Sequence, residues 1–112
     1  MINPIRIFDE EKEKEYTLEF DLSVVKYAEN RGFSIGDVER FPATKIPELF
    51  WYAFRKHHPE MAKANTDKLL EDLGGIGGLS EEFMERLGGL YQQAVLSVGD
   101  EKVRKNSLRV EL

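Results

Sequence analysis

The chain contains no cysteine, which excludes disulfide bonds, thiolate nucleophiles and zinc sites built on cysteine. It also has no apolar run that approaches the length of a membrane span. Its first residues, MINPIRIFDEE, lack the apolar core of a signal peptide. The absence of cysteine fits a reducing compartment, so we expect the protein to act in the cytoplasm in which it is made.

Residues suited to catalysis or metal binding are scarce. The only histidines, His57 and His58, diverge by about 100° as neighbours on a helix, so they cannot easily bind one metal together. We expect structural roles instead, with His57 continuing an apolar stripe and His58 helping to end the helix. The glycine-rich residues 74–78 do not form a phosphate loop, because a leucine-rich segment precedes them and no Gly-Lys-Ser/Thr follows. The sequence therefore predicts no catalytic, cofactor-binding or metal-binding residues, and a binding protein rather than an enzyme.

Charge argues against nucleic acid as a partner. The chain has 21 acidic and 16 basic residues, giving a net charge of −5, and no basic cluster is interleaved with aromatic residues. A hydrophobic content of 41% and a charged content of 33% are typical of a soluble globular domain. At 112 residues the chain has room for one modest core.

The N-terminal residues favour a β-hairpin. Segments 4–9 and 16–21 are separated by the charged run EEKEKE, and Tyr16, Leu18 and Phe20 alternate with polar residues. Asp21 or Ser23 can then cap a helix that Gly32 ends, with the next residue packing back over its last turn.

Further helices follow in the remaining sequence. A short helix is expected within residues 34–43, and Thr44 is a candidate cap for an aromatic helix with Pro47 in its first turn. Asn65-Thr66 predicts the start of a leucine helix ended by Gly74-Gly75, which would link it to a last helix capped by Ser80. Gly88-Gly89 predicts a bend or a close helix contact there. The predicted architecture is α+β, an N-terminal β-hairpin packed against a bundle of about four helices. We expect residues 1–98 to form one domain and residues 99–112 a mobile C-terminal tail.

The aromatic helix, within PELFWYAFRKHHP, has more apolar surface than one core-facing stripe requires. Phe50 and Phe54 have core spacing and are expected to pack on the hairpin. Trp51, Tyr52 and Phe41 are open between core and interface, since interfaces favour large aromatic residues. These three are the candidate partner-binding residues.

The order of these features resembles a known family. A hairpin ending YTLEFDLSVVKYAENRGF, then IPELFWYAFRKHHPEM, then a leucine helix ahead of GGLYQQAV resemble the small tail assembly chaperones of long-tailed (siphovirus-type) bacteriophages and prophages. The resemblance covers about residues 4–98, and its signals are the "E..GF" helix end at Glu29, Gly32 and Phe33 and the "LF..AF..HHP" block.

The resemblance implies a non-enzymatic protein of the host cytoplasm. Such chaperones coat the long, hydrophobic tape measure protein, keep it soluble, recruit tail tube subunits and are absent from the finished virion. We also expect self-association when the client is missing, because an unoccupied apolar patch pairs with itself.

Three points stay open at the level of sequence. In this family the gene is often read by ribosomal frameshifting, and Arg104-Lys105-Asn106 can be encoded by AGA-AAA-AAC, which contains a slippery run; an ordinary polar tail is the alternative. The chain could instead be a head–tail or tail-completion adaptor that remains in the particle. It could also be a small regulatory module that binds one helical peptide in a groove.

Overall fold

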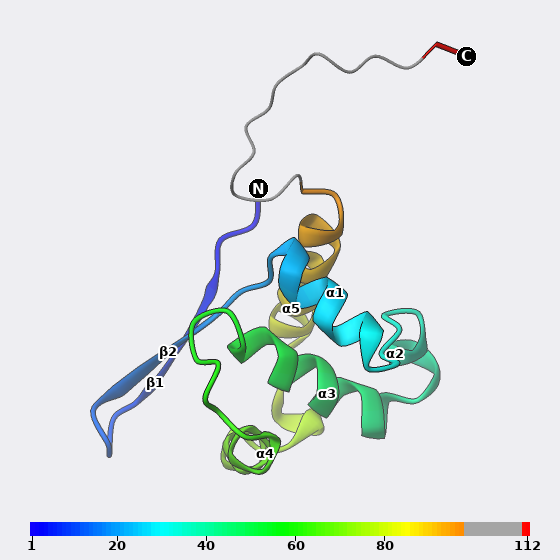
Figure 1. Cartoon of the computed structure of the whole chain (residues 1–112). Helices are drawn as coiled ribbons and strands as arrows, with labels where there is room; N and C mark the ends of the chain where they lie inside the picture. The colour runs from blue at the N-terminus through cyan, green and yellow to red at the C-terminus, as the bar shows by residue number, and fades with distance from the viewer. Residues whose placement is uncertain (98–110) are drawn as a thin grey trace.

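A computed structural model describes residues 1–97 and 111–112 of the chain (Figure 1). A two-stranded antiparallel hairpin precedes a set of helices, which confirms the predicted α+β architecture. The predicted mobile tail lies, except for residues 111–112, outside the described residues. The elements are β1 (Ile5–Asp9), β2 (Lys14–Leu18), α1 (Leu22–Asn30), α2 (Asp37–Arg40), α3 (Pro42–Phe54), α4 (Lys63–Asp72), the 3-10 turn η1 (Ile76–Gly78) and α5 (Glu81–Val95).

The hairpin has one buried and one exposed face. Ile5 pairs with Leu18 and Ile7 pairs with Tyr16, so these four side chains share the face that turns toward the helices. β2 begins earlier than residue 16 because the chain reverses tightly, with the Asp9 carboxylate accepting a hydrogen bond from a backbone amide of the turn. Strand pairing therefore extends over five residues of each strand.

The ends of α1 agree with the sequence prediction. The Asp21 carboxylate accepts a hydrogen bond from the Val24 amide at 2.9 Å and so caps the helix. Gly32 adopts a left-handed conformation with φ of 93°, and the Phe33 amide donates to the Ala28 carbonyl at 3.0 Å. This arrangement folds Phe33 back into the core, as expected.

The start of α3 differs from the prediction that Thr44 caps it. The helix begins at Pro42, whose fixed φ and missing amide suit the first helical position, and the Phe41 carbonyl accepts from the Lys45 amide at 2.9 Å. The Thr44 hydroxyl donates to that same carbonyl at 3.3 Å instead of capping the helix. Pro47 consequently lies inside the helix and not in its first turn.

The two later helices confirm one predicted cap and correct another. α4 begins at Lys63, before the expected Asn65-Thr66 cap, because Thr66 is buried and its hydroxyl donates to the Lys63 carbonyl at 3.0 Å. Ser80 caps α5 as predicted, accepting from a backbone amide at 3.0 Å. The close approach expected at Gly89 involves the N-terminal segment, since a Cβ there would lie 2.5 Å from the Ile2 Cδ1.

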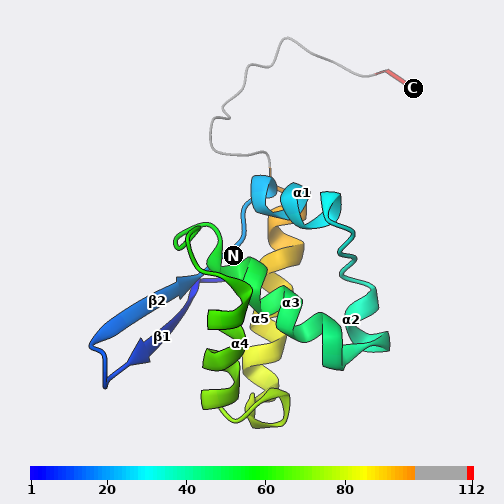
Figure 2. The ribbon, with the colours of Figure 1, turned by 60° about the horizontal axis from the view of Figure 1, so that its bottom comes forward.

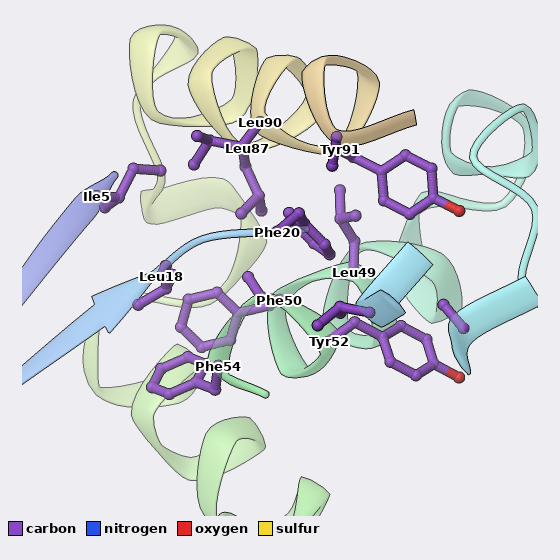
Figure 3. Close-up of a cluster of buried hydrophobic side chains, with 14 of the residues drawn as sticks. Ile5, Leu18, Phe20, Leu49, Phe50, Tyr52, Phe54, Leu87, Leu90 and Tyr91 are labelled. Carbon is purple, nitrogen blue, oxygen red and sulfur yellow. The ribbon is translucent and has the colours of Figure 1, made fainter. Parts of the chain in front are cut away.

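α3 supplies the centre of the core (Figure 3). Phe50 and Phe54 are fully buried, and the ring centroids of Phe54 and Tyr16 lie 5.7 Å apart, which confirms the predicted contact with the hairpin. Side chains from β1, β2 and α5 converge on the same cluster in Figure 3. The labelled members are Ile5, Leu18, Phe20, Leu49, Phe50, Tyr52, Phe54, Leu87, Leu90 and Tyr91.

Neither histidine has the role expected for it. α3 ends at Phe54, so the helical stripe does not reach His57, which is exposed and places its Nε2 2.7 Å from the Glu19 Oε1. His58 packs edge-on against Tyr16, with ring centroids 5.4 Å apart. Its Nε2 accepts a hydrogen bond from the Thr17 amide at 3.0 Å. His58 thus covers part of the outer edge of β2.

Phe54→Ala should lower the free energy of unfolding by roughly 3–5 kcal/mol, because it leaves a cavity in the centre of the core. That loss approaches the whole stability of a marginal domain. Urea denaturation followed by circular dichroism measures it. Phe41→Ala is the matched control: Phe41 is 53% exposed, so the same substitution should cost no more than about 0.5 kcal/mol. Equal losses for the two variants would show that the core is placed wrongly.

Candidate functional site

The three aromatic residues expected to bind a partner do not form one patch. Tyr52 is only 4% exposed, because α1 and the chain after it cover that flank of α3; its ring meets those of Tyr27 and Phe33. Of the two alternatives left open for Tyr52, the structure shows the core, so its ring is not available to a partner in this fold. Phe41 is exposed but stands at the start of α3, roughly three turns before Trp51. Whether Trp51 or Phe41 binds a partner stays a prediction.

Trp51 is half-buried and held on both sides. Its indole N–H donates to the Met61 carbonyl at 3.0 Å, and the Arg31 guanidinium lies 5.4 Å from its ring centroid. A hydrogen bond to Tyr52 is the main cause that raises the pKa of Arg31. The arginine remains charged and partly covers the aromatic surface, which leaves less of it available to a partner.

A groove lined by both apolar and charged residues opens between the hairpin and α4. We call it the α4–hairpin groove; its volume is about 690 Å³. Phe8 is 65% exposed on one wall and Leu73 is 38% exposed on the other. Figure 2 shows β1 as the strand nearer to α4. The groove is lined by Ile7, Phe8, Leu69 and Leu73 and by the charged residues Asp9, Glu10, Glu11, Lys12, Lys68 and Asp72.

The two edges of the hairpin differ in their hydrogen bonding. The Thr17 amide of β2 donates to His58, and the Glu19 amide just after β2 donates to the Ala53 carbonyl at 2.9 Å, so both amides point away from β1. Arg6 lies opposite Thr17, and Phe8 lies two residues further along β1. In an antiparallel ladder, the N–H and C=O groups of Arg6 and Phe8 must then point away from β2.

The outer edge of β1 is therefore open. Among the described residues, none pairs with the backbone N–H of Arg6 or Phe8. These groups face the side on which the α4–hairpin groove lies, and an unpaired strand edge beside apolar side chains is a template for another chain. The groove thus combines exposed apolar area with backbone N–H groups that have no hydrogen-bond partner among the described residues.

The sequence contained a signal for this site. Ile7 and Phe8 are consecutive apolar residues in a strand, and a two-layer arrangement can bury only one of them. Ile7 shares the inner face with Tyr16, which leaves Phe8 on the outer face. No local sequence signal indicated that Leu69 and Leu73 would line the groove, because the leucines of this helix were interpreted only as its apolar positions.

A second groove lies on the other flank of α4. This α3–α4 groove has a volume of about 510 Å³, with apolar wall atoms from Ala43, Pro47, Leu70 and Ile76. Its rim is charged and carries an ion pair in which the Lys63 Nζ lies 3.1 Å from the Asp67 carboxylate. None of its lining residues is a large apolar side chain as exposed as Phe8 or Leu73.

The glycine-rich residues 74–78 join α4 to α5, as the sequence predicted. Gly74 and Gly75 have φ of 101° and 71°, values that favour glycine. A Cβ on Gly78 would lie 2.6 Å from the Leu73 carbonyl oxygen, so this position also needs glycine. The glycines are accounted for by the tight turn that ends α4 beside Leu73.

No group of three or more histidine, aspartate or glutamate side chains is placed to hold a metal ion within residues 1–97 and 111–112. In the same residues, no helix is both long enough and apolar enough to cross a bilayer.

One polar group in the described core has no partner. The Tyr91 hydroxyl is buried, and no acceptor meets it in hydrogen-bonding geometry. Burial is the main cause that raises the pKa of Tyr91 to about 12, and the nearby Glu29 carboxylate adds to the shift. The neutral phenol is thus favoured in the folded chain.

A family model matches residues 1–112, so the chain belongs to that family, whose description is "Domain of unknown function (DUF5055)". Neither the curated proteins nor the solved structures contain a match to the chain. The family description assigns no activity.

Tyr91→Phe should leave the neutral-pH stability unchanged or higher, because it removes a buried hydroxyl that has no partner. The raised pKa gives a second expectation. Below about pH 10 the phenol is neutral in both states, while between about pH 10 and pH 12 the unfolded chain loses the proton first, so parent stability falls. The variant should lose less stability over that interval. Urea denaturation at several pH values tests this, with Tyr27→Phe as control; a large neutral-pH loss in Tyr91→Phe would reveal a hydrogen bond.

Proposed function

We propose that this chain is a phage tail assembly chaperone that binds and solubilises the tape measure protein and helps to recruit tail tube subunits. We place the client in the α4–hairpin groove, as an alternative to the sequence prediction that Trp51 and Phe41 bind it. The proposal draws on the resemblance in the order of sequence features. The observation that carries it is that Phe8 and Leu73, two exposed large apolar residues, line the same groove. Large apolar residues that gather on an open surface mark an interaction site.

The chemistry of the groove suits such a client. A tape measure protein is a long helical rod whose apolar faces are exposed until the tail tube encloses it. An open groove with apolar walls offers adaptable contact instead of a single deep pocket. Carboxylates line its rim, and a net charge of −5 helps to keep a complex in solution.

Further properties belong to the same proposal. The protein would be non-enzymatic, would act in the host cytoplasm and would leave before the virion is complete. It would bind neither nucleic acid nor membrane and would self-associate without its client. The gene would carry a frameshift site at the codons for Arg104-Lys105-Asn106, which sequencing tests directly.

One alternative is favoured by a separate observation. The α3–α4 groove lies between two helices, and a groove of that kind suits a small module that binds one helical peptide. This alternative would be supported by a single defined peptide partner whose binding lowers the solvent accessibility of the Pro47 and Ile76 side chains. The head–tail or tail-completion adaptor would instead be detected in purified particles.

The double variant Phe8→Ser with Leu73→Ser should abolish solubilisation of a co-expressed tape measure protein, because it removes apolar area from both walls of the groove. The measurement is the fraction of the client in the soluble lysate. Since both side chains are exposed, thermal unfolding of the variant should stay close to that of the parent.

The matched control is Phe41→Ser with Leu96→Ser, which makes the same two changes at exposed positions outside the groove. This control should solubilise the client as well as the parent does. If the control fails and the groove variant works, the client binds elsewhere. If the parent never keeps the client soluble, the chaperone function itself is wrong.

A further inference from the structure

We infer that His58 is a proton-controlled clasp on the outer edge of β2, whose neutral ring holds the Thr17 amide and whose protonated ring releases it. The Thr17 amide nitrogen lies 3.0 Å from the His58 Nε2. A backbone N–H can only donate, so this ring nitrogen must accept with its lone pair. The proton of the neutral ring must then lie on Nδ1. The clasp would operate whatever partner the chain binds.

Protonation of the ring removes the acceptor. An imidazolium carries a proton on both nitrogens and has no lone pair left to accept a hydrogen bond. Two N–H groups would then face each other across the same 3.0 Å, so the ring and the strand must separate. β1 offers no replacement, because Thr17 lies opposite Arg6 and its N–H points away from that strand. Acid would thus undo one link between the hairpin and the segment that follows α3.

No carboxylate of the described residues forms an ion pair with His58. On β2 the His58 ring packs against Tyr16, and the Lys14 Nζ lies 5.9 Å from the Tyr16 ring centroid. On the side of α3, His58 and Arg55 line one small cavity, whose lining contains no acidic residue. A positive ring would therefore gain no opposite charge in this cavity. The titratable and charged groups that surround the ring are Lys14, Tyr16, Tyr27, Tyr52, Arg55 and His57.

His57 makes the opposite kind of contact near the same edge. Its Nε2 lies 2.7 Å from the Glu19 Oε1, and a carboxylate oxygen only accepts, so this nitrogen carries a proton. The Lys56 Nζ lies 3.7 Å from the same oxygen. Protonation of His57 keeps the hydrogen bond and adds a charge to it. Acid should therefore release His58 from the edge of β2 and leave His57 in place.

The next outward amide along the chain supplies an internal control. The Glu19 amide donates to the Ala53 carbonyl at 2.9 Å, and neither group in that hydrogen bond titrates. Thr17 and Glu19 are two residues apart, so their amides report on the same segment. A general loosening of the hairpin would affect both amides, whereas release of the clasp would affect Thr17 and not Glu19.

Amide exchange of the isotope-labelled, full-length chain tests the clasp between about pH 5 and pH 8, the range in which histidine ordinarily changes charge. Protection is the exchange rate of an unstructured peptide divided by that of the folded chain at the same pH. Protection of the Thr17 amide should fall about tenfold as the His58 ring gains its proton, because the amide loses its acceptor, while that of Glu19 stays constant. An equal fall at both amides would overturn the proposal, as would an unchanged Thr17 while the ring titrates.

Two substitutions at His58 separate the acceptor from the ring. His58→Gln keeps an acceptor oxygen near the end of the side chain and does not titrate, so Thr17 should stay protected at every pH. His58→Phe keeps an aromatic ring against Tyr16 but has no acceptor, so protection of Thr17 should be low at every pH. His57→Gln is the matched control for His58→Gln and should leave the response of Thr17 to pH unchanged. Loss of that response in His57→Gln would assign the switch to His57 and overturn the proposal.

The position of the ring proton gives a test that needs no variant. At about pH 8 the nitrogen chemical shifts of the two imidazole rings distinguish a nitrogen that carries a proton from one that does not. His58 should carry its proton on Nδ1, and His57 should carry its proton on Nε2. A proton on the His58 Nε2 in the neutral ring would overturn the proposal, and this result can be read even if the His58 variants do not fold.

Discussion

Burial of the aromatic helix α3 is the constraint on which the rest of the structure depends. Leu49, Phe50 and Phe54 are almost wholly inaccessible, and α3 packs against β2, α2, α4 and α5. A two-stranded hairpin is at best marginally stable alone, so its order comes from this contact. Tyr16 and Leu18 enter the core beside α3, and the Ala53 carbonyl accepts the Glu19 amide.

The same packing leaves the candidate site open. His58 accepts the outward amide of Thr17 and the Ala53 carbonyl accepts the amide of Glu19, just after β2, whereas the outward amides of Arg6 and Phe8 on β1 gain no such partner among the described residues. α4 has its main helix contact with α3 and buries only Thr66 and Leu70. The hairpin and α4 are therefore each fixed to α3, and the space between them forms the α4–hairpin groove.

Sequence reasoning succeeded where the determinant is local. The caps at Asp21 and Ser80 and the left-handed Gly32 depend on a few neighbouring residues, and the spacing of Phe50 and Phe54 reports burial directly. It left Tyr52 undecided between core and interface, because helical spacing cannot show which flank another helix covers. It also misplaced His57, since nothing in the spacing shows that α3 ends at Phe54.

The groove could not be predicted for a related reason. Its walls come from β1 and α4, which are far apart in sequence; β1 is held by its pairing with β2, which contacts α3, and α4 contacts α3 directly. The consecutive Ile7 and Phe8 indicated that one apolar side chain had to remain outside, but not what would lie opposite it. The wall at Leu73 is set by the glycine turn that ends α4.

The most direct test of the central claim is a chemical-shift map of the isotope-labelled chain with and without a soluble segment of the tape measure protein. If the α4–hairpin groove holds the client, the backbone resonances of Phe8, Leu69 and Leu73 should change most. Those of Phe41 and the Trp51 indole should change little. Large changes at Phe41 and Trp51, with Phe8 and Leu73 unmoved, would contradict the account.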